Sequence, residues 1–328
     1  MENLFNMPKI SFVVVSHNFE DYILDCLNSI KNQDYQNLEL VIVDDLSTDK
    51  TVERIEEFCV QNHGLTIKFV KNEKNIGQLA SFLRGLKEVD GEFVAQIDGD
   101  DVLFRDYAKV HIEAHLKTSV ALTSCKHIDV DAKNVVHTFE SIDCPQESKQ
   151  GFNLFEEKES ELKSSFVKER ESDYDVKILP NDKYNFATWH WAPTSSGVMR
   201  KSVCDLLLKL KNPQKVKITS DKFVFSFAHL IGSSAIIQKT LYAYRKHNSN
   251  YSLANPVMGS KRYLKTKTQS NYIRNNRLIR QEMFKFVAGN YPYFVERFNR
   301  AEVMRILKKI VFSFDINTLK SVIKSLFI

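Results

Sequence analysis

The chain has 328 residues, of which 43% are hydrophobic and 27% charged, and its formal net charge is +5. This length allows one large domain with an appendage, or two domains, and the composition is that of a soluble globular protein. Five scattered cysteines without a Cys-x-x-Cys pair exclude a disulfide framework and a cysteine zinc site, and they indicate a reducing compartment. No signal-peptide pattern or 18-residue apolar run is visible, so we expect a cytoplasmic protein without a membrane span.

In the first 100 residues, short apolar runs alternate with amphipathic segments. The expected strands cover residues 9–16, 38–43, 66–70 and 93–97, and the expected helices cover residues 22–32, 52–59 and 79–89. Alternation of this kind predicts right-handed βαβ units and therefore an α/β fold with a mostly parallel sheet.

Acidic residues follow two of these strands. Asp44 and Asp45 end one strand, and residues 98–101 (Asp-Gly-Asp-Asp) end another. Ligands of parallel sheets bind outside the carboxyl ends of the strands, so both groups are expected at one crevice edge. Oxygen ligands of this kind suit Mg²⁺ or Mn²⁺ bridged to the phosphates of a substrate. The alternative is a pair of acidic turns, because Asp and Gly are ordinary turn residues.

Four segments in this order resemble the family 2 glycosyltransferases of the GT-A fold: residues 10–18, 41–51, 75–77 and 97–101. The resemblance implies a nucleotide-diphosphate sugar as donor and a divalent metal, Mn²⁺ or Mg²⁺. By position it implies that Asp44 contacts the base, Asp98 the ribose side and Asp100 the metal. It also implies that the donor site includes the residues Ser16, Asn18, Asp45 and Gly77. Family members often carry Arg-Asn where Phe82-Leu83 stand here, and Arg84 is the expected substitute.

After a helix over residues 104–117, residues 121–128 and 135–139 read as a strand pair. Residues 141–183 are dense in Glu, Lys and Ser, and they are either a solvated helix and loop or a mobile lid near an acceptor. The following aromatic segment contains Trp189, His190 and Trp191. These side chains are either an acceptor-binding wall for a sugar or core packing.

Asp221 stands at the start of an apolar helix, where an acid is also favourable to the helix dipole. The resemblance implies that it is the catalytic base, although Ser220 replaces the Glu that the family often has before it. After an expected strand over residues 235–244, residues 244–252 resemble the closing motif of the family. There Arg245 and Lys246 are expected to face a diphosphate and His247 to bind metal or phosphate. The alternative is a basic strand end facing solvent.

Residues 257–328 contain 15 Lys and Arg against 4 Asp and Glu, whereas the first 256 residues are net acidic. Helices are expected over residues 263–288, 294–314 and 318–327. The amphipathic pattern of residues 303–328 fits packing on the catalytic domain or binding to an anionic membrane surface. Without a recognisable nucleic-acid module, we do not expect nucleic-acid binding.

We therefore predict a GT-A catalytic domain over residues 1–256 and a basic helical extension over residues 257–328. Within the domain, residues 1–130 form the donor and metal half and residues 131–256 the acceptor half. The predicted function is inverting transfer of a sugar to a glycan or lipid-linked acceptor in cell-surface glycan assembly, by an enzyme that is cytoplasmic or peripheral on the membrane. The alternatives are a nucleotidyltransferase acting on a sugar phosphate and a non-catalytic module that binds glycan or nucleic acid.

Overall fold

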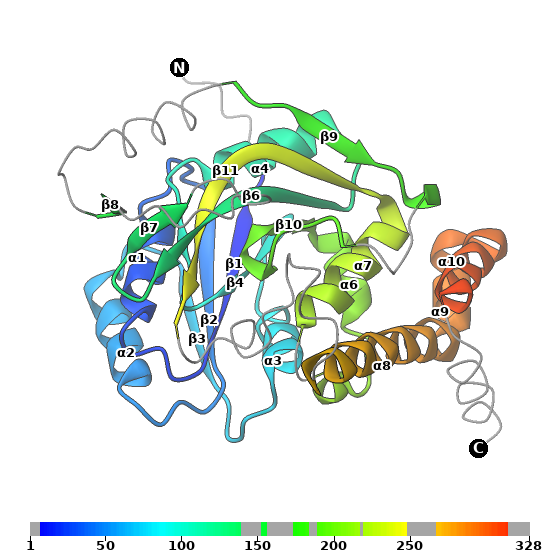
Figure 1. The fold of residues 1–328 in the computed structure, drawn as a ribbon, viewed down its shortest axis with the longest axis horizontal. Helices are drawn as coiled ribbons and strands as arrows, with labels where there is room; N and C mark the ends of the chain where they lie inside the picture. Colours follow the sequence, from blue (N-terminus) through cyan, green and yellow to red (C-terminus); the bar gives the residue numbers. More distant parts are fainter. Residues whose placement is uncertain are drawn as a thin grey trace.

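The computed structural model describes residues 7–138, 152–155, 173–183, 189–216, 219–247 and 267–313. One mixed sheet runs through the molecule, with helices on both of its faces (Figure 1). The predicted α/β architecture is thus confirmed.

The order of strands along the sheet is β3-β2-β1-β4-β10-β6-β11-β5; β7 pairs with β6 and β8, and β9 pairs with β11. The strands are β1 (Ile10–Ser16), β2 (Leu38–Asp44), β3 (Ile67–Lys71), β4 (Phe93–Asp98), β5 (Val102–Leu103), β6 (Leu122–Asp131), β7 (Val135–Thr138), β8 (Phe152–Asn153), β9 (Val176–Leu179), β10 (Gly197–Arg200) and β11 (Ser234–Lys246).

The central strand β1 is buried along its whole length, which is why its sequence is apolar almost throughout. Its side chains nevertheless alternate between two hydrophobic cores: Val13 and Val15 face one, and Phe12 and Val14 face the other. Each core needs helices to cover it, and the first half of the chain supplies helices to both faces.

The helices are α1 (Ile23–Lys31), α2 (Thr51–Gln61), α3 (Gln78–Gly85), α4 (Tyr107–Lys117), α6 (Lys201–Leu207), α7 (Ser220–Gly232), α8 (Lys267–Gly289), α9 (Tyr291–Phe298) and α10 (Arg300–Phe312). Side chains of α1, α2 and α4 enter one core, and those of α3, α6 and α7 enter the other. The chain changes face between β1 and β4, and a ligand crevice is expected outside the carboxyl ends of the strands at such a switch point.

Some elements differ from the sequence-based prediction. The short strands β5 and β9 and the helix α6 were not expected. The helix predicted over residues 294–314 is two helices, because Asn299 has a φ of 68° and its side chain accepts a hydrogen bond from Glu302 N. The helix predicted over residues 318–327 and most of the segment 141–183 lie outside the described residues.

The described part of the C-terminal extension packs against the catalytic domain. Phe286 of α8 and Phe294 of α9 contact Phe227 of α7, with ring centroids 5.2 and 6.1 Å apart. In α10, the side chains of Val303 and Ile306 are buried in the same core. Figure 1 shows α8, α9 and α10 gathered beyond α6 and α7, away from α1 and α2. Val303 and Ile306 are therefore covered by protein, as in the packing alternative, whereas binding of this segment to a membrane surface stays a prediction; residues 314–328 lie outside the described residues.

Within the residues that the structure describes, no helix combines the length and the apolar character that crossing a membrane requires.

Candidate active site

The acidic strand ends lie together at one edge of the sheet, as the sequence predicts. In the parallel pairings of β1, Ser16 is opposite Asp44 on β2, and Val15 is opposite Asp98 on β4. The carboxyl groups of Asp44 and Asp98 therefore stand on the two neighbours of one strand. Ser16 lies between them, and its buried hydroxyl has no hydrogen-bond partner within the described residues.

The loop after β1 is tied to the loop after β2. Asn18, with a φ of 57°, accepts a hydrogen bond from Thr48 N (2.7 Å) and donates its own N–H to Ser47 Oγ (2.9 Å). Asp44 in turn accepts hydrogen bonds from Ser47 N (2.9 Å) and from the Ser47 hydroxyl. The side chains of Asn18 and Asp44 thus stabilise the rim of the crevice before any ligand binds.

Asp45 holds the loop before α3 through its side chain. Its carboxylate accepts hydrogen bonds from Asn72 Nδ2 (2.8 Å), Ile76 N (2.9 Å) and Gly77 N (2.8 Å). Gly77 has a φ of 85°, a conformation that favours glycine. Arg84 donates to Asn72 Oδ1 (2.7 Å) and so supports the same loop. Both carboxylate oxygens of Asp45 are thus bonded to this loop, and its predicted contact with the donor stays a prediction.

Asp98 is linked to the helix that carries Asp221. Gln78, the first residue of α3, donates to Asp98 Oδ1 (2.5 Å) and accepts from Ser220 Oγ (2.8 Å). Ser220 also accepts a hydrogen bond from Gln96 Nε2 (3.0 Å). Ser220, which replaces the Glu of the family pattern, therefore holds the start of α7 against β4. Sequence reasoning missed Gln78, whose position just after Gly77 was the available signal.

Asp221 is partly buried at the first turn of α7, where its Oδ1 accepts a hydrogen bond from Lys222 N (2.8 Å). Burial raises the pKa of Asp221 to about 6. A carboxyl group with this pKa is ionised at neutral pH and is a stronger base than an exposed aspartate. The geometry thus gives Asp221 the properties that a general base needs.

The loop 98–101 concentrates negative charge. Burial, followed by the charge of Asp100, raises the pKa of Asp98 to about 7 and that of Asp101 well above its usual range. Asp100 Oδ2 lies 2.8 Å from His247 Nε2, and both side chains are almost fully buried. Asp101 Oδ2 is buried without a hydrogen-bond partner among the described residues. A cation near this loop would relieve the repulsion between the carboxylates.

These residues fit a divalent metal that is shared with a substrate. Asp100 and His247 supply one oxygen and one nitrogen ligand, which Mn²⁺ accepts and Mg²⁺ accepts less readily. In the part of the chain that the structure describes, no three His, Cys, Asp or Glu side chains could hold a metal together. The remaining ligands would have to come from water or from phosphate oxygens, as is usual for Mg²⁺ in phosphate-binding sites.

A cavity of about 550 Å³ opens beside this pair of side chains. Its walls include Asn18 and Tyr22 after β1, Lys133 in the β6–β7 turn, and Lys246 with His247 at the end of β11. Lys246 forms an ion pair with Asp129 (2.6 Å). Lys133, which the sequence did not single out, lines the same cavity, whose walls also carry the carboxylates of Glu20, Asp21, Asp49 and Asp131.

Arg245 does not face this cavity. Its side chain is fully buried, and its guanidinium bonds to Asp25, Asn134 and the backbone oxygen of Asp100. The structure therefore gives no support to the expectation that Arg245 donates to a diphosphate. Residues 248–252 of the closing motif lie outside the described residues.

The three aromatic residues 189–191 differ in how deeply they are buried. Trp191 is 4% exposed and donates from Nε1 to Ser234 Oγ (2.9 Å), and its ring packs edge-on against Phe225. It belongs to the core, which is the packing alternative for this residue. Trp189 is partly buried and its ring stacks on Phe225, whereas His190 is exposed. Of the three aromatic residues, Trp189 and His190 are the ones with accessible side chains in the described part of the chain.

Comparisons with known proteins agree with the geometry. A family model described as "Glycosyl transferase family 2" matches residues 11–200. An uncharacterized glycosyltransferase of Haemophilus influenzae is 37% identical over 97 residues, which cover 30% of this chain and 29% of that protein. The chain matches less than half the length of each of four curated relatives, between 14% and 46%.

Two solved structures share the fold. TarS residues 1–349 of S. aureus, in complex with UDP-GlcNAc, aligns with a TM-score of 0.56 and 17% identity over 94% of this chain and 82% of that chain. The mannosyltransferase PcManGT of Pyrobaculum calidifontis, in complex with GDP-Man and Mn²⁺, aligns with a TM-score of 0.53 and 14% identity over 95% and 89%. At these identities the likeness shows the fold alone.

Proposed function

This chain belongs to glycosyl transferase family 2, and we propose that it transfers a sugar, with inversion, from a nucleotide-diphosphate sugar to a hydroxyl group of an acceptor. The observation that carries the proposal is the convergence of Asp44, Asp98 and Asp100 at one edge of the sheet. Asp221 is joined to the same edge through Gln78 and Ser220.

The donor lies across the ends of β1, β2 and β4. Asp44 faces the base, the unpartnered hydroxyl of Ser16 is available to the nucleoside, and Asp98 lies on the ribose side. Gly77 and Arg84 contribute to the donor site indirectly, because they help to hold the loop before α3 in place. The relatives with UDP-GlcNAc and with GDP-Man and Mn²⁺ support a nucleotide sugar at this position, without indicating which base this chain selects.

A divalent ion, Mn²⁺ or Mg²⁺, would be held by Asp100 and His247. When bound, it would supply positive charge that stabilises the leaving nucleoside diphosphate. Lys133 and Lys246 are the cations on the wall of the neighbouring cavity, and the leaving group, which departs as an anion, needs such positive charge rather than a proton.

Asp221 acts as the general base. Its raised pKa matches the task of accepting a proton from the acceptor hydroxyl while remaining ionised at neutral pH. The hydroxyl oxygen attacks the anomeric carbon, the bond from this carbon to the diphosphate oxygen breaks, and the hydroxyl proton moves to the Asp221 carboxylate. Attack opposite the leaving group inverts the anomeric centre.

The acceptor is a glycan or a lipid-linked glycan of cell-surface assembly. Its contacts are Trp189 and His190, because Trp191 is committed to the core. The relative TarS of Staphylococcus aureus is named a poly(ribitol-phosphate) β-N-acetylglucosaminyltransferase, which supports this class of product for the family. A cytoplasmic location with peripheral attachment to an anionic membrane is part of the proposal. The attachment uses cations of residues 303–328, of which Lys308 is exposed, without insertion of the buried side chains of α10.

The proposal is tested by incubating the protein with a panel of UDP- and GDP-sugars and a mixture of glycan acceptors, and by measuring the release of nucleoside diphosphate. We expect release with at least one donor, dependent on Mn²⁺ or Mg²⁺ and lost in Asp221→Asn. Release that persists in both Asp221→Asn and Asp100→Ala would refute the assignment. Asp205→Asn, an exposed ion-paired aspartate on α6, is the matched control.

A further inference from the structure

Arg245 is the largest fully buried side chain among the described residues, and it lies at the end of β11 next to the metal pair. Arginine is rarely buried unless it is paired. Here its backbone N–H donates to Asp101 Oδ1 (3.0 Å), and its Nε donates to the backbone oxygen of Asp100 (2.7 Å). One residue thus binds two consecutive residues of the acidic loop.

The far end of the guanidinium is anchored on two other segments. Nη2 donates to Asp25 Oδ2 of α1 (3.0 Å), and Nη1 donates to Asn134 Oδ1 of the β6–β7 turn. Asn134 has a φ of 64°, and its own amide also points at Asp25 (3.4 Å). The guanidinium carbon stands 4.9 Å from the ring centroid of Tyr22. A planar fork with several fixed donors can make all these contacts at once, whereas an ammonium group cannot.

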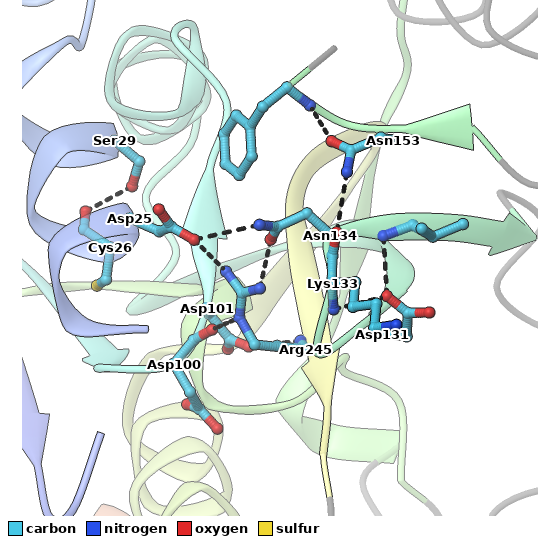
Figure 2. A network of polar contacts seen from close by, with 12 residues as sticks. Asp25, Cys26, Ser29, Asp100, Asp101, Asp131, Lys133, Asn134, Asn153 and Arg245 are labelled. Atoms are coloured by element: carbon cyan, nitrogen blue, oxygen red, sulfur yellow. Dashed lines mark hydrogen bonds and ion pairs between the residues drawn. The ribbon is translucent and has the colours of Figure 1, made fainter. Parts of the chain in front are cut away.

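Figure 2 shows the consequence for Asp100. Its backbone oxygen turns toward Arg245, and its carboxylate turns away from it. That carboxylate meets His247, which follows Arg245 by two residues. Arg245 therefore fixes the backbone of Asp100, while the carboxylate of the same residue stays with His247, and Arg245 itself does not line the cavity.

We propose that Arg245 is a positioning residue of the active site: it holds the Asp100 carboxylate in the orientation that binds the divalent ion, and it makes no contact with the phosphates of the donor. This role rests on the proposed function. In this role Arg245 supports the acidic loop 98–101, and the cations that line the cavity are Lys133 and Lys246.

The test is Mn²⁺ titration by calorimetry into Arg245→Lys in the presence of excess UDP, and in parallel GDP. We expect the Kd of Mn²⁺ to rise about tenfold or more, while UDP or GDP binding without metal is unchanged. Saturating Mn²⁺ should restore most of the transfer rate. A structural role alone would lower the melting temperature without shifting the Mn²⁺ requirement. Arg105→Lys, which replaces an exposed ion-paired arginine, is the matched control and should bind Mn²⁺ as the wild type does.

A second variant keeps the proposal testable if Arg245→Lys does not fold. Asp25→Asn removes the charge of the remote anchor, and we expect a smaller rise in the Kd of Mn²⁺ in the same direction. If Asp25→Asn instead tightens nucleotide binding without metal, the freed guanidinium contacts phosphate and the proposal is overturned. An unshifted Mn²⁺ affinity in Arg245→Lys overturns it as well. Absence of Mn²⁺ binding in the wild type, with either nucleotide, would overturn the proposed metal site itself and this role with it.

Discussion

Replacement of Asp221 by Asn should stabilise the fold and stop transfer. In the folded protein burial raises the pKa of Asp221 from 3.8 to about 6. Because the folded state binds this proton more tightly than the unfolded state, the free energy of unfolding falls as the pH rises from about 4 to about 6, and stays low above that range. At about 1.36 kcal/mol for each pKa unit, the full penalty at pH 7 is roughly 3 kcal/mol. Because the side chain is only partly buried, we expect Asp221→Asn to raise the free energy of unfolding at pH 7 by about 1–2 kcal/mol.

The assay is urea denaturation of the wild type and Asp221→Asn at pH 7 and at pH 4, without metal. The amide can still accept the hydrogen bond from Lys222 N, so the start of α7 is preserved. We expect the variant to be more stable at pH 7, to lose this advantage at pH 4, and to bind Mn²⁺ with nucleotide as the wild type does. Asp205→Asn should change stability by less than about 0.5 kcal/mol at either pH, as for other surface positions. A variant that is no more stable at pH 7, or that still transfers sugar, would refute the reasoning.

Three further changes test other parts of the structure. Asp100→Ala should abolish Mn²⁺-dependent binding of UDP or GDP in calorimetry, because His247 alone cannot hold the ion; unchanged affinity would remove Asp100 from the metal site. Phe227→Ala, which empties the contact of α7 with Phe286 and Phe294, should cost about 3–5 kcal/mol in chemical denaturation, whereas a loss below about 1 kcal/mol would show that α8 and α9 do not support α7. Burial lowers the pKa of His115 to about 3, so stability should fall as the pH drops from about 6.5. Between pH 7 and pH 5 the melting temperature of His115→Gln should fall less than that of the wild type. An equal fall in the two proteins would contradict this cause.

The strand pattern predicted the site because its position depends on local signals. Each acid stands at the end of its own strand in the sequence, and the parallel pairing of β2 and β4 with β1 brings Asp44 and Asp98 to one edge. The same reasoning could not find the environment of Arg245. Its partners Asp25 and Asn134 are 220 and 111 residues away, so a basic strand end looked like an exposed donor.

Tertiary contacts also decided the aromatic segment. Trp189 and Trp191 stand two residues apart among small polar residues, which is compatible with a sugar-binding wall or with a core. Trp191 is assigned to the core by its contact with Phe225 of α7 and by the hydrogen bond from its indole nitrogen to Ser234. The break at Asn299, in contrast, had a readable signal: Asn followed three residues later by Glu302 is a helix-start pattern.

The most direct measurement is the anomalous scattering of Mn²⁺ in crystals grown with Mn²⁺ and UDP or GDP. We expect one strong peak within coordination distance of Asp100 Oδ2 and His247 Nε2, with the nucleotide extending over Asp44. A peak elsewhere, or a nucleotide bound away from the ends of β1, β2 and β4, would contradict the site.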